Sequence, residues 1–197
     1  AGTYTITIKG TCVGWQFNNV GDRLKILSVT SWGKMRLGNV GANFMGCANF
    51  NSPSTTDILD TTGMTSFNDC FRNCSALGSI GRMHEWNMSN IQSLSQMFYQ
   101  CGNFNQNLGN WNTSSVINLN AVFYACSSFS NGGSGSIGLW DTANVTSMNS
   151  TFANAFSFNQ NLGAWNVSNV TDFFRMFWNC PFNNGGSNTI NLSLIHI

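Results

Sequence analysis

The hydrophobic residues of this chain recur at fixed distances from a series of tryptophans. A Phe stands twelve residues after five of the seven Trp residues, as from Trp86 to Phe98, and twelve residues after Leu59, which takes the place of a Trp. The pairs are Trp32 and Phe44, Leu59 and Phe71, Trp86 and Phe98, Trp111 and Phe123, Trp140 and Phe152, and Trp165 and Phe177. Six copies with one interval indicate an internal repeat, whose starts lie 27, 27, 25, 29 and 25 residues apart.

Other positions keep the same register. Three residues after the Phe stand Cys47, Cys74, Cys101, Cys126, Ala155 and Cys180. A coil of about 25 residues cannot bury its apolar side alone, whereas stacked coils bury a continuous core in which each position forms a ladder. The pattern therefore predicts a repeat solenoid of about six coils over residues 29–191.

Within each coil we expect a short parallel strand followed by a helical turn. In the fifth copy the strand covers residues 145–148, the turn runs from Phe152 to Ala155, and a second extended piece covers residues 158–165. A continuous helix up to the Cys position is the alternative. The Gly-rich segments 131–135 and 183–187 are expected to form exposed loops.

The two ends of the chain depart from the repeat. Residues 1–28 predict an N-terminal β segment, because Tyr4, Ile6 and Ile8 alternate with polar residues. Residues 2–10 look like the last strand of a PKD-like sandwich, so we expect 1–28 to be the end of a truncated domain plus a cap. Residues 192–197 resemble a translated sequencing adapter, and Ser193 stands where the next Trp is due. We expect an adapter-derived tail there, with further coils in the natural protein. An ordinary capping strand is the alternative.

One repeat carries a specific resemblance. The segment from Phe158 to Asp172, FNQNLGAWNVSNVTD, resembles the BspA-type surface-protein repeat, and Phe104 to Val116 matches it nearly as well. That repeat is a relative of the leucine-rich repeat, is abundant in mycoplasma-type surface lipoproteins and also occurs in phage proteins. The resemblance covers roughly residues 32–191, although Leu59 replaces Trp in the second copy. It implies a leucine-rich-repeat-like, surface-exposed interaction module, and it brings no catalytic residues.

Composition and charge exclude several classes of protein. Apolar residues make up 42% of the chain, charged residues 8%, and the formal net charge is +1. A normal apolar share with little net charge argues against intrinsic disorder. Nucleic-acid binding normally needs a basic patch, and the sequence has none. No apolar run approaches the ~20 residues that span a bilayer, so we expect no membrane span.

Candidate chemistry is sparse. After Glu85 the only charged residues are Asp141, Asp172 and Arg175, so no convergent acid–base set can be built and we expect no enzyme. A polysaccharide-active solenoid working through Asp141 or Asp172 is the enzyme alternative. Zinc would need four ligands, such as Cys70, Cys74 and His84 with Cys47 or Cys101. The Cys ladder explains these thiols without metal, so we expect mostly free cysteines, no metal and no cofactor.

The sequence therefore favours a non-enzymatic extracellular binding or adhesion module of a bacterial surface protein or phage appendage. Its partner would be a protein or glycan on a cell surface, and its exposed end could support self-association. The regular Trp and Phe spacing predicts a core rather than sugar-stacking platforms. A structural spacer or virion component is the alternative. We expect the ligand to contact the outward strand positions, which are Gln92, Ser93, Asn118, Thr146, Ser147 and Thr171.

Overall fold

The computed structural model of the chain describes residues 2–186 and contains little regular secondary structure. Two short parallel strands, β1 (Cys12–Val13) and β2 (Met35–Arg36), pair with Cys12 opposite Met35. The helical elements are all 3₁₀ turns: η1 (Met83–Glu85), η2 (Asn131–Gly133), η3 (Gly135–Leu139) and η4 (Asn184–Gly186). None of the helices in residues 2–186 has the length and hydrophobicity needed to span a membrane.

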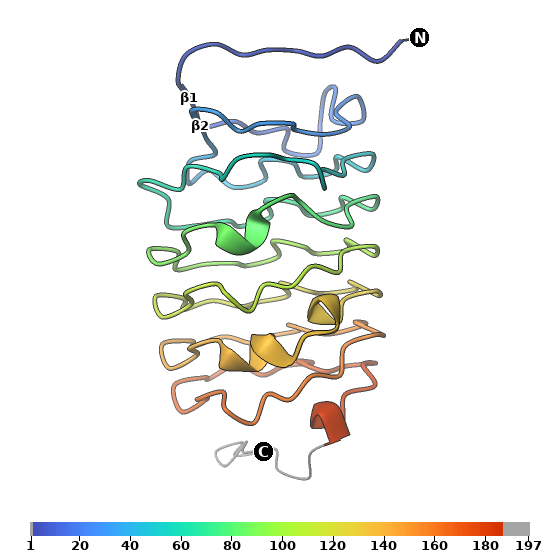
Figure 1. Cartoon of the computed structure of the whole chain (residues 1–197). Coiled ribbons are helices and arrows are strands. Elements are labelled where there is room, and N and C mark those ends of the chain that lie inside the picture. Colours follow the sequence, from blue (N-terminus) through green and yellow to red (C-terminus); the bar gives the residue numbers. More distant parts are fainter. Residues whose placement is uncertain (1, 187–197) are drawn as a thin grey trace.

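The chain runs as successive circuits stacked one above the next, from the N-terminal end to the C-terminal end (Figure 1). We call each circuit a coil. Isolated parallel bridges join Ser66 to Ser93, Ser93 to Asn118, Asn118 to Ser147, and Ser147 to Asp172. Each bridge links the same position in neighbouring repeats, so one repeat forms one coil and successive coils lie in register.

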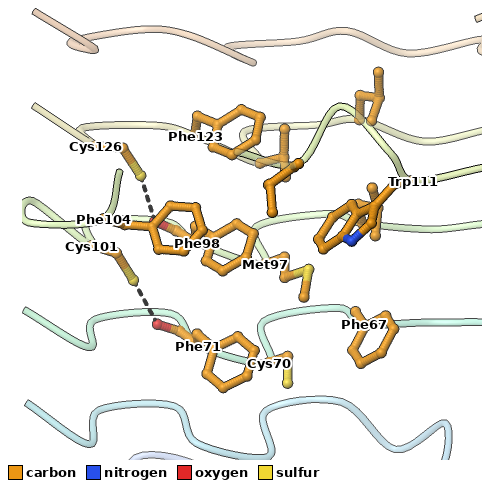
Figure 2. Close-up of a cluster of buried hydrophobic side chains, with 14 of the residues drawn as sticks. Phe67, Cys70, Phe71, Met97, Phe98, Cys101, Phe104, Trp111, Phe123 and Cys126 are labelled. Atoms are coloured by element: carbon orange, nitrogen blue, oxygen red, sulfur yellow. Dashed lines mark hydrogen bonds between the residues drawn. The ribbon is translucent and has the colours of Figure 1, made fainter. Parts of the chain in front are cut away.

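A slab of phenylalanine rings fills the core (Figure 2). The Phe98 centroid lies 5.8 Å from that of Phe71 and 5.9 Å from that of Phe123, and the three rings are nearly parallel. Within its own coil Phe98 also stacks on Phe104 at 3.9 Å. All four rings are fully buried. The offset stacking fits the preferred geometry of aromatic pairs and ties each coil to both neighbours.

The Trp side chains form a second ladder. Trp111 and Trp140 are 3% exposed and stack at 6.1 Å, and Trp140 stacks on Trp165 at 6.3 Å. The indole Nε1 of Trp111 donates to the carbonyl of Met83 at 2.9 Å, and that of Trp140 to the carbonyl of Leu108 at 3.1 Å. The prediction that these rings belong to the core is confirmed.

The predicted helical turn from Phe152 to Ala155 is wrong, and so is the continuous helix. Ser150 and Asn154 have left-handed backbone, with φ of 54° and 58°. Amides that close local turns, such as Ala155 N to Phe152 O at 3.1 Å, alternate with amides that bond to the next coil, such as Phe152 N to Met176 O at 2.9 Å. A helix would use all of these amides locally, whereas the stack needs half of them between coils. The predicted strand over residues 145–148 is reduced to the single bridged residue Ser147.

Around each Phe, the backbone hydrogen bonds that join one coil to the next all point the same way. The amide of Phe71 donates to Met97 O at 2.9 Å, that of Phe98 to Val122 O at 3.1 Å, and that of Phe123 to Thr151 O at 3.0 Å. Around each Phe, alternate amides therefore face the following coil and alternate carbonyls face the preceding coil.

Thiols form a third ladder beside the Phe rings. The Sγ atoms of Cys101 and Cys126 donate to the carbonyls of Phe71 and Phe98 at 2.9 and 2.8 Å, as the dashed lines in Figure 2 show. All seven cysteines are unpaired. A buried thiol here acts as a small apolar group with one weak donor.

The N-terminal residues differ from the predicted β segment in part. Residues 2–9 contain no assigned strand, and the side chains of Tyr4 and Ile6 are 84% exposed. The truncated sandwich over 1–28 stays a prediction. Phe17, by contrast, packs on Phe44 at 6.3 Å and donates its amide to Asn43 O at 2.9 Å, as the repeat phenylalanines do. The proposed tail, residues 192–197, lies outside the described residues.

The first Gly-rich segment is not simply an exposed loop. Asn131 begins η2 and is fully buried, and its Oδ1 accepts the amide of Leu108 at 2.7 Å. Gly132 and Gly133 are exposed and have φ of 62° and 77°, which glycine adopts readily. The insertion therefore supplies a partner for a buried amide of the preceding coil.

We expect Trp111→Ala to lower the free energy of unfolding by ~3–5 kcal/mol, because it leaves a cavity and removes the hydrogen bond from the indole to the Met83 carbonyl. Chemical denaturation measures this change. Trp178→Ala is the matched control, because that ring is 50% exposed and its loss should cost less than about 1 kcal/mol. Equal costs for the two variants would contradict a buried Trp ladder.

We also expect iodoacetamide to leave five thiols unmodified in the folded chain. Cys47, Cys70, Cys74, Cys101 and Cys126 are buried, whereas Cys12 and Cys180 are partly accessible. Burial raises the pKa of the Cys47 thiol to about 12, so little nucleophilic thiolate is present near neutral pH. Mass spectrometry of native and guanidinium-unfolded samples counts the labels. Rapid native labelling of Cys101 or Cys126 would show that the coils do not stack this way.

Candidate functional site

One continuous surface of half-buried and exposed side chains lies along the arcs that lead into and past each Phe. We call it the outer strip: the non-buried side chains of residues 65–73, 92–100, 117–125, 146–154 and 171–179. Between them, buried residues such as Leu94 and Met97 point into the core. The strip therefore repeats once per coil and presents equivalent positions side by side.

The structure brings the six predicted ligand residues together on this strip. Ser93, Asn118 and Ser147 form the bridged ladder and are half-buried. The other three residues, Gln92, Thr146 and Thr171, are exposed in the adjacent ladder.

The two ladders differ in the hydrogen bonds that their side chains make within the protein. Ser93 Oγ donates to Asn68 Oδ1 at 2.5 Å, and Asn118 Oδ1 accepts the amide of Asn120 at 2.8 Å. The hydroxyls of Thr146 and Thr171 make longer bonds of 3.3 Å to carbonyls of the preceding coil. The exposed ladder is therefore the better candidate for ligand contact.

An aromatic ladder on the same strip was not predicted from the sequence. Tyr99 and Tyr124 stack at 4.5 Å with an interplanar angle of 4°. The guanidinium of Arg72 lies 4.6 Å from the Tyr99 centroid, and its Nη1 bonds Asp69 Oδ1 at 3.0 Å. The sequence feature that could have indicated this ladder is the position directly after each Phe. It holds Met45, Arg72, Tyr99, Tyr124, Ala153 and Trp178.

A second cluster lies on the last described coil. The guanidinium carbon of Arg175 is 4.9 Å from the centroid of Phe174 and 5.4 Å from that of Trp178. The two rings are 61% and 50% exposed. Within residues 2–186, no carboxylate pairs with Arg175.

All seven acidic side chains make contacts that hold the backbone or another side chain. Burial raises the pKa of Asp57, but hydrogen bonds from Ser31 Oγ and from the amides of Trp32 and Gly33 outweigh it and leave that pKa below its ordinary value. Hydrogen bonds from Thr62 and Arg36 lower the pKa of Asp60 to about 2. The remaining acidic residues bond to nearby groups: Asp22 to Lys25, Asp69 to Arg72, Glu85 to Arg82, Asp141 to the amide of Ala143, and Asp172 to Asn149 and to the amide of Phe174.

Asp141 and Asp172, the two candidate catalytic carboxylates, lie in different coils and make different contacts. Asp141 caps the turn after Trp140, whereas Asp172 is bridged to Ser147 in the strand ladder. Neither is joined to a second ionisable group in the described residues by a hydrogen bond or ion pair.

The cysteines and His84 do not gather into a zinc site. His84 is exposed and its Nε2 lies 3.6 Å from Glu85 Oε1, while Cys70 and Cys74 are buried in the thiol-lined core. Burial raises the pKa of both thiols well above the ordinary value. Among residues 2–186, no group of three or more His, Cys, Asp and Glu side chains could hold a metal ion.

Comparison with known proteins gives a family and nothing finer. Two successive segments, residues 15–135 and 134–195, match the family described as "Mycoplasma protein of unknown function, DUF285". No curated protein and no solved structure matches the chain. The two matches cover nearly the whole sequence and include every repeat, so the chain belongs to this DUF285 family.

Proposed function

We propose that the chain is a leucine-rich-repeat-like solenoid that acts as a non-enzymatic binding module outside the cell, on a bacterial surface or in a phage appendage. One observation carries this proposal: the outer strip places exposed and half-buried amide, hydroxyl and aromatic side chains in register over five coils. Stacked coils make extended surfaces of this kind, which suit shallow recognition of a protein or glycan.

The chemistry of the strip supports binding over catalysis. Its outward side chains include Gln92, Tyr99, Tyr124 and Thr146, which offer hydrogen bonds and ring surfaces. The two acidic residues of the strip, Asp69 and Asp172, are engaged with Arg72 and Asn149. Binding through such a surface needs no reorganisation of the core, because the core positions point the other way.

The test is binding of the purified chain to a panel of bacterial and animal cell surfaces. We expect saturable binding to at least one surface. The combined variant Gln92→Arg, Thr146→Arg and Thr171→Arg should weaken it by about tenfold or more, because three bulky charges cover the exposed ladder. Ile117 occupies the same ladder position in another coil, so these sites tolerate a change of side chain.

The control is Ala164→Arg, at an exposed position beside the buried Trp165 and away from the outer strip. It adds bulk and charge and should leave both binding and the melting temperature unchanged. An unimpaired triple variant would show that the strip is not the binding face. A folded chain that binds no surface would favour the alternative function, a structural spacer or virion component.

A further inference from the structure

The cluster of Phe174, Arg175 and Trp178 stands apart from the rest of the outer strip. It combines one guanidinium with two aromatic rings that are each at least half exposed. The rings flank the Phe177 position, three residues before it and one residue after it. The position after the Phe also faces outward in two inner coils, where Tyr99 and Tyr124 have coils on both sides and are half-buried.

An earlier coil shows the positions of Arg175 and Trp178 occupied by a different pair of residues. Asp69 and Arg72 stand two before and one after Phe71, and their side chains form an ion pair of 3.0 Å. In the last described coil Arg175 takes the place of Asp69, and Trp178 takes that of Arg72. The arginine charge is neutralised within the first pair. In the second pair, Arg175 contacts the ring of Trp178 where Arg72 contacts the carboxylate of Asp69.

The nearest acidic residue in the sequence is engaged elsewhere. Asp172 accepts from Asn149 Nδ2 at 3.0 Å with one oxygen and from the amide of Phe174 at 3.0 Å with the other. Arg175 therefore has contacts to ring faces but no carboxylate partner among residues 2–186. Stacking on rings leaves the in-plane N–H groups of a guanidinium available for an anion.

The two kinds of group in this cluster match the two parts of an acidic sugar. A planar guanidinium binds both oxygens of a carboxylate with parallel hydrogen bonds. A pyranose ring carries a face of C–H bonds, and an exposed indole offers a flat apolar surface for it. Alongside, Asn179 Nδ2 donates to Asn154 Oδ1 at 2.9 Å, which leaves further amide groups for sugar hydroxyls.

We propose that Phe174, Arg175 and Trp178 form a binding site for a carboxylate-bearing sugar residue. The inference rests on the proposed binding function and names its ligand class. An acidic protein is the less suitable partner, because a stable protein interface buries more than about 1,200 Å² around an apolar centre. The neighbouring strip offers small polar groups such as Asn149 and Ser150 instead.

Calorimetric titration tests the site with two acidic probes and their neutral counterparts. A hyaluronan hexasaccharide, which carries glucuronate, is paired with chitohexaose, and sialyllactose is paired with lactose. We expect at least one acidic probe to bind about tenfold more tightly than its neutral partner, with affinity falling as salt rises. The probe that binds distinguishes a uronate from a sialic acid.

The repeat supplies substitutions that the fold already accepts. Gln96 occupies the left-handed position of Arg175, and Ala153 occupies the position of Trp178. Arg175→Gln and Trp178→Ala should therefore keep the melting temperature and weaken the acidic probe by about tenfold each. Arg82→Gln is the matched control and should leave binding unchanged, because that exposed guanidinium is already paired with Glu85 and lies outside the outer strip.

Three results would overturn this site: no binding of either acidic probe, equal binding of acidic and neutral probes, or unchanged binding by Arg175→Gln. Cell binding that depends on Phe174, Arg175 and Trp178 but survives removal of surface glycans would identify a protein partner and also overturn it. The outcomes separate from those of the proposed function. Cell binding without saccharide binding would contradict only the proposed sugar site. Saccharide binding without cell binding would contradict only the proposed cell-surface function.

Discussion

Backbone hydrogen bonds between coils are the constraint on which the rest of the structure depends. Residues 2–186 contain no α-helix, and their strands are two residues long, so a single coil cannot satisfy its own amides and carbonyls. Around each Phe, alternate amides donate to the following coil, as Phe98 does to Val122. Buried polar backbone must be paired, so each coil is completed only by its neighbour. The Phe, Trp and thiol ladders then follow from this register, because equivalent residues are brought face to face.

The direction of those amides depends on two left-handed residues that flank each Phe. They are Asp69 and Asn73, Gln96 and Gln100, and Ala121 and Ala125 in three successive coils. A non-glycine residue pays roughly 1–2 kcal/mol for this conformation. The cost is offset by the bonds that it permits between coils. The same geometry fixes the number of residues from Trp to Phe, and the variation in repeat length falls beyond it, where insertions such as 131–135 are accommodated.

The sequence predicted the buried side of this protein better than its surface. Trp111, Phe123 and Cys126 recur at fixed intervals because burial selects residue type, so periodicity alone indicated the core and the coil register. The predicted helical turn failed because spacings of three and four also suit successive turns closed by bonds between residues three apart. Phe17 was missed because no Trp precedes it by twelve residues.

The outer strip shows which surface features the sequence could not predict. Gln92 and Thr146 could be assigned to one face because they keep a ladder position, but Arg72, Tyr99 and Trp178 share a position at which residue type changes from coil to coil. Only the stacking of the coils makes Arg72 and Tyr99 neighbours. That stacking also has a mechanical meaning. The bonds between coils lie along the axis of the stack, so tension applied between its two ends loads them a few at a time. Under such a pull the molecule would open coil by coil, as an extensible tether rather than a rigid strut.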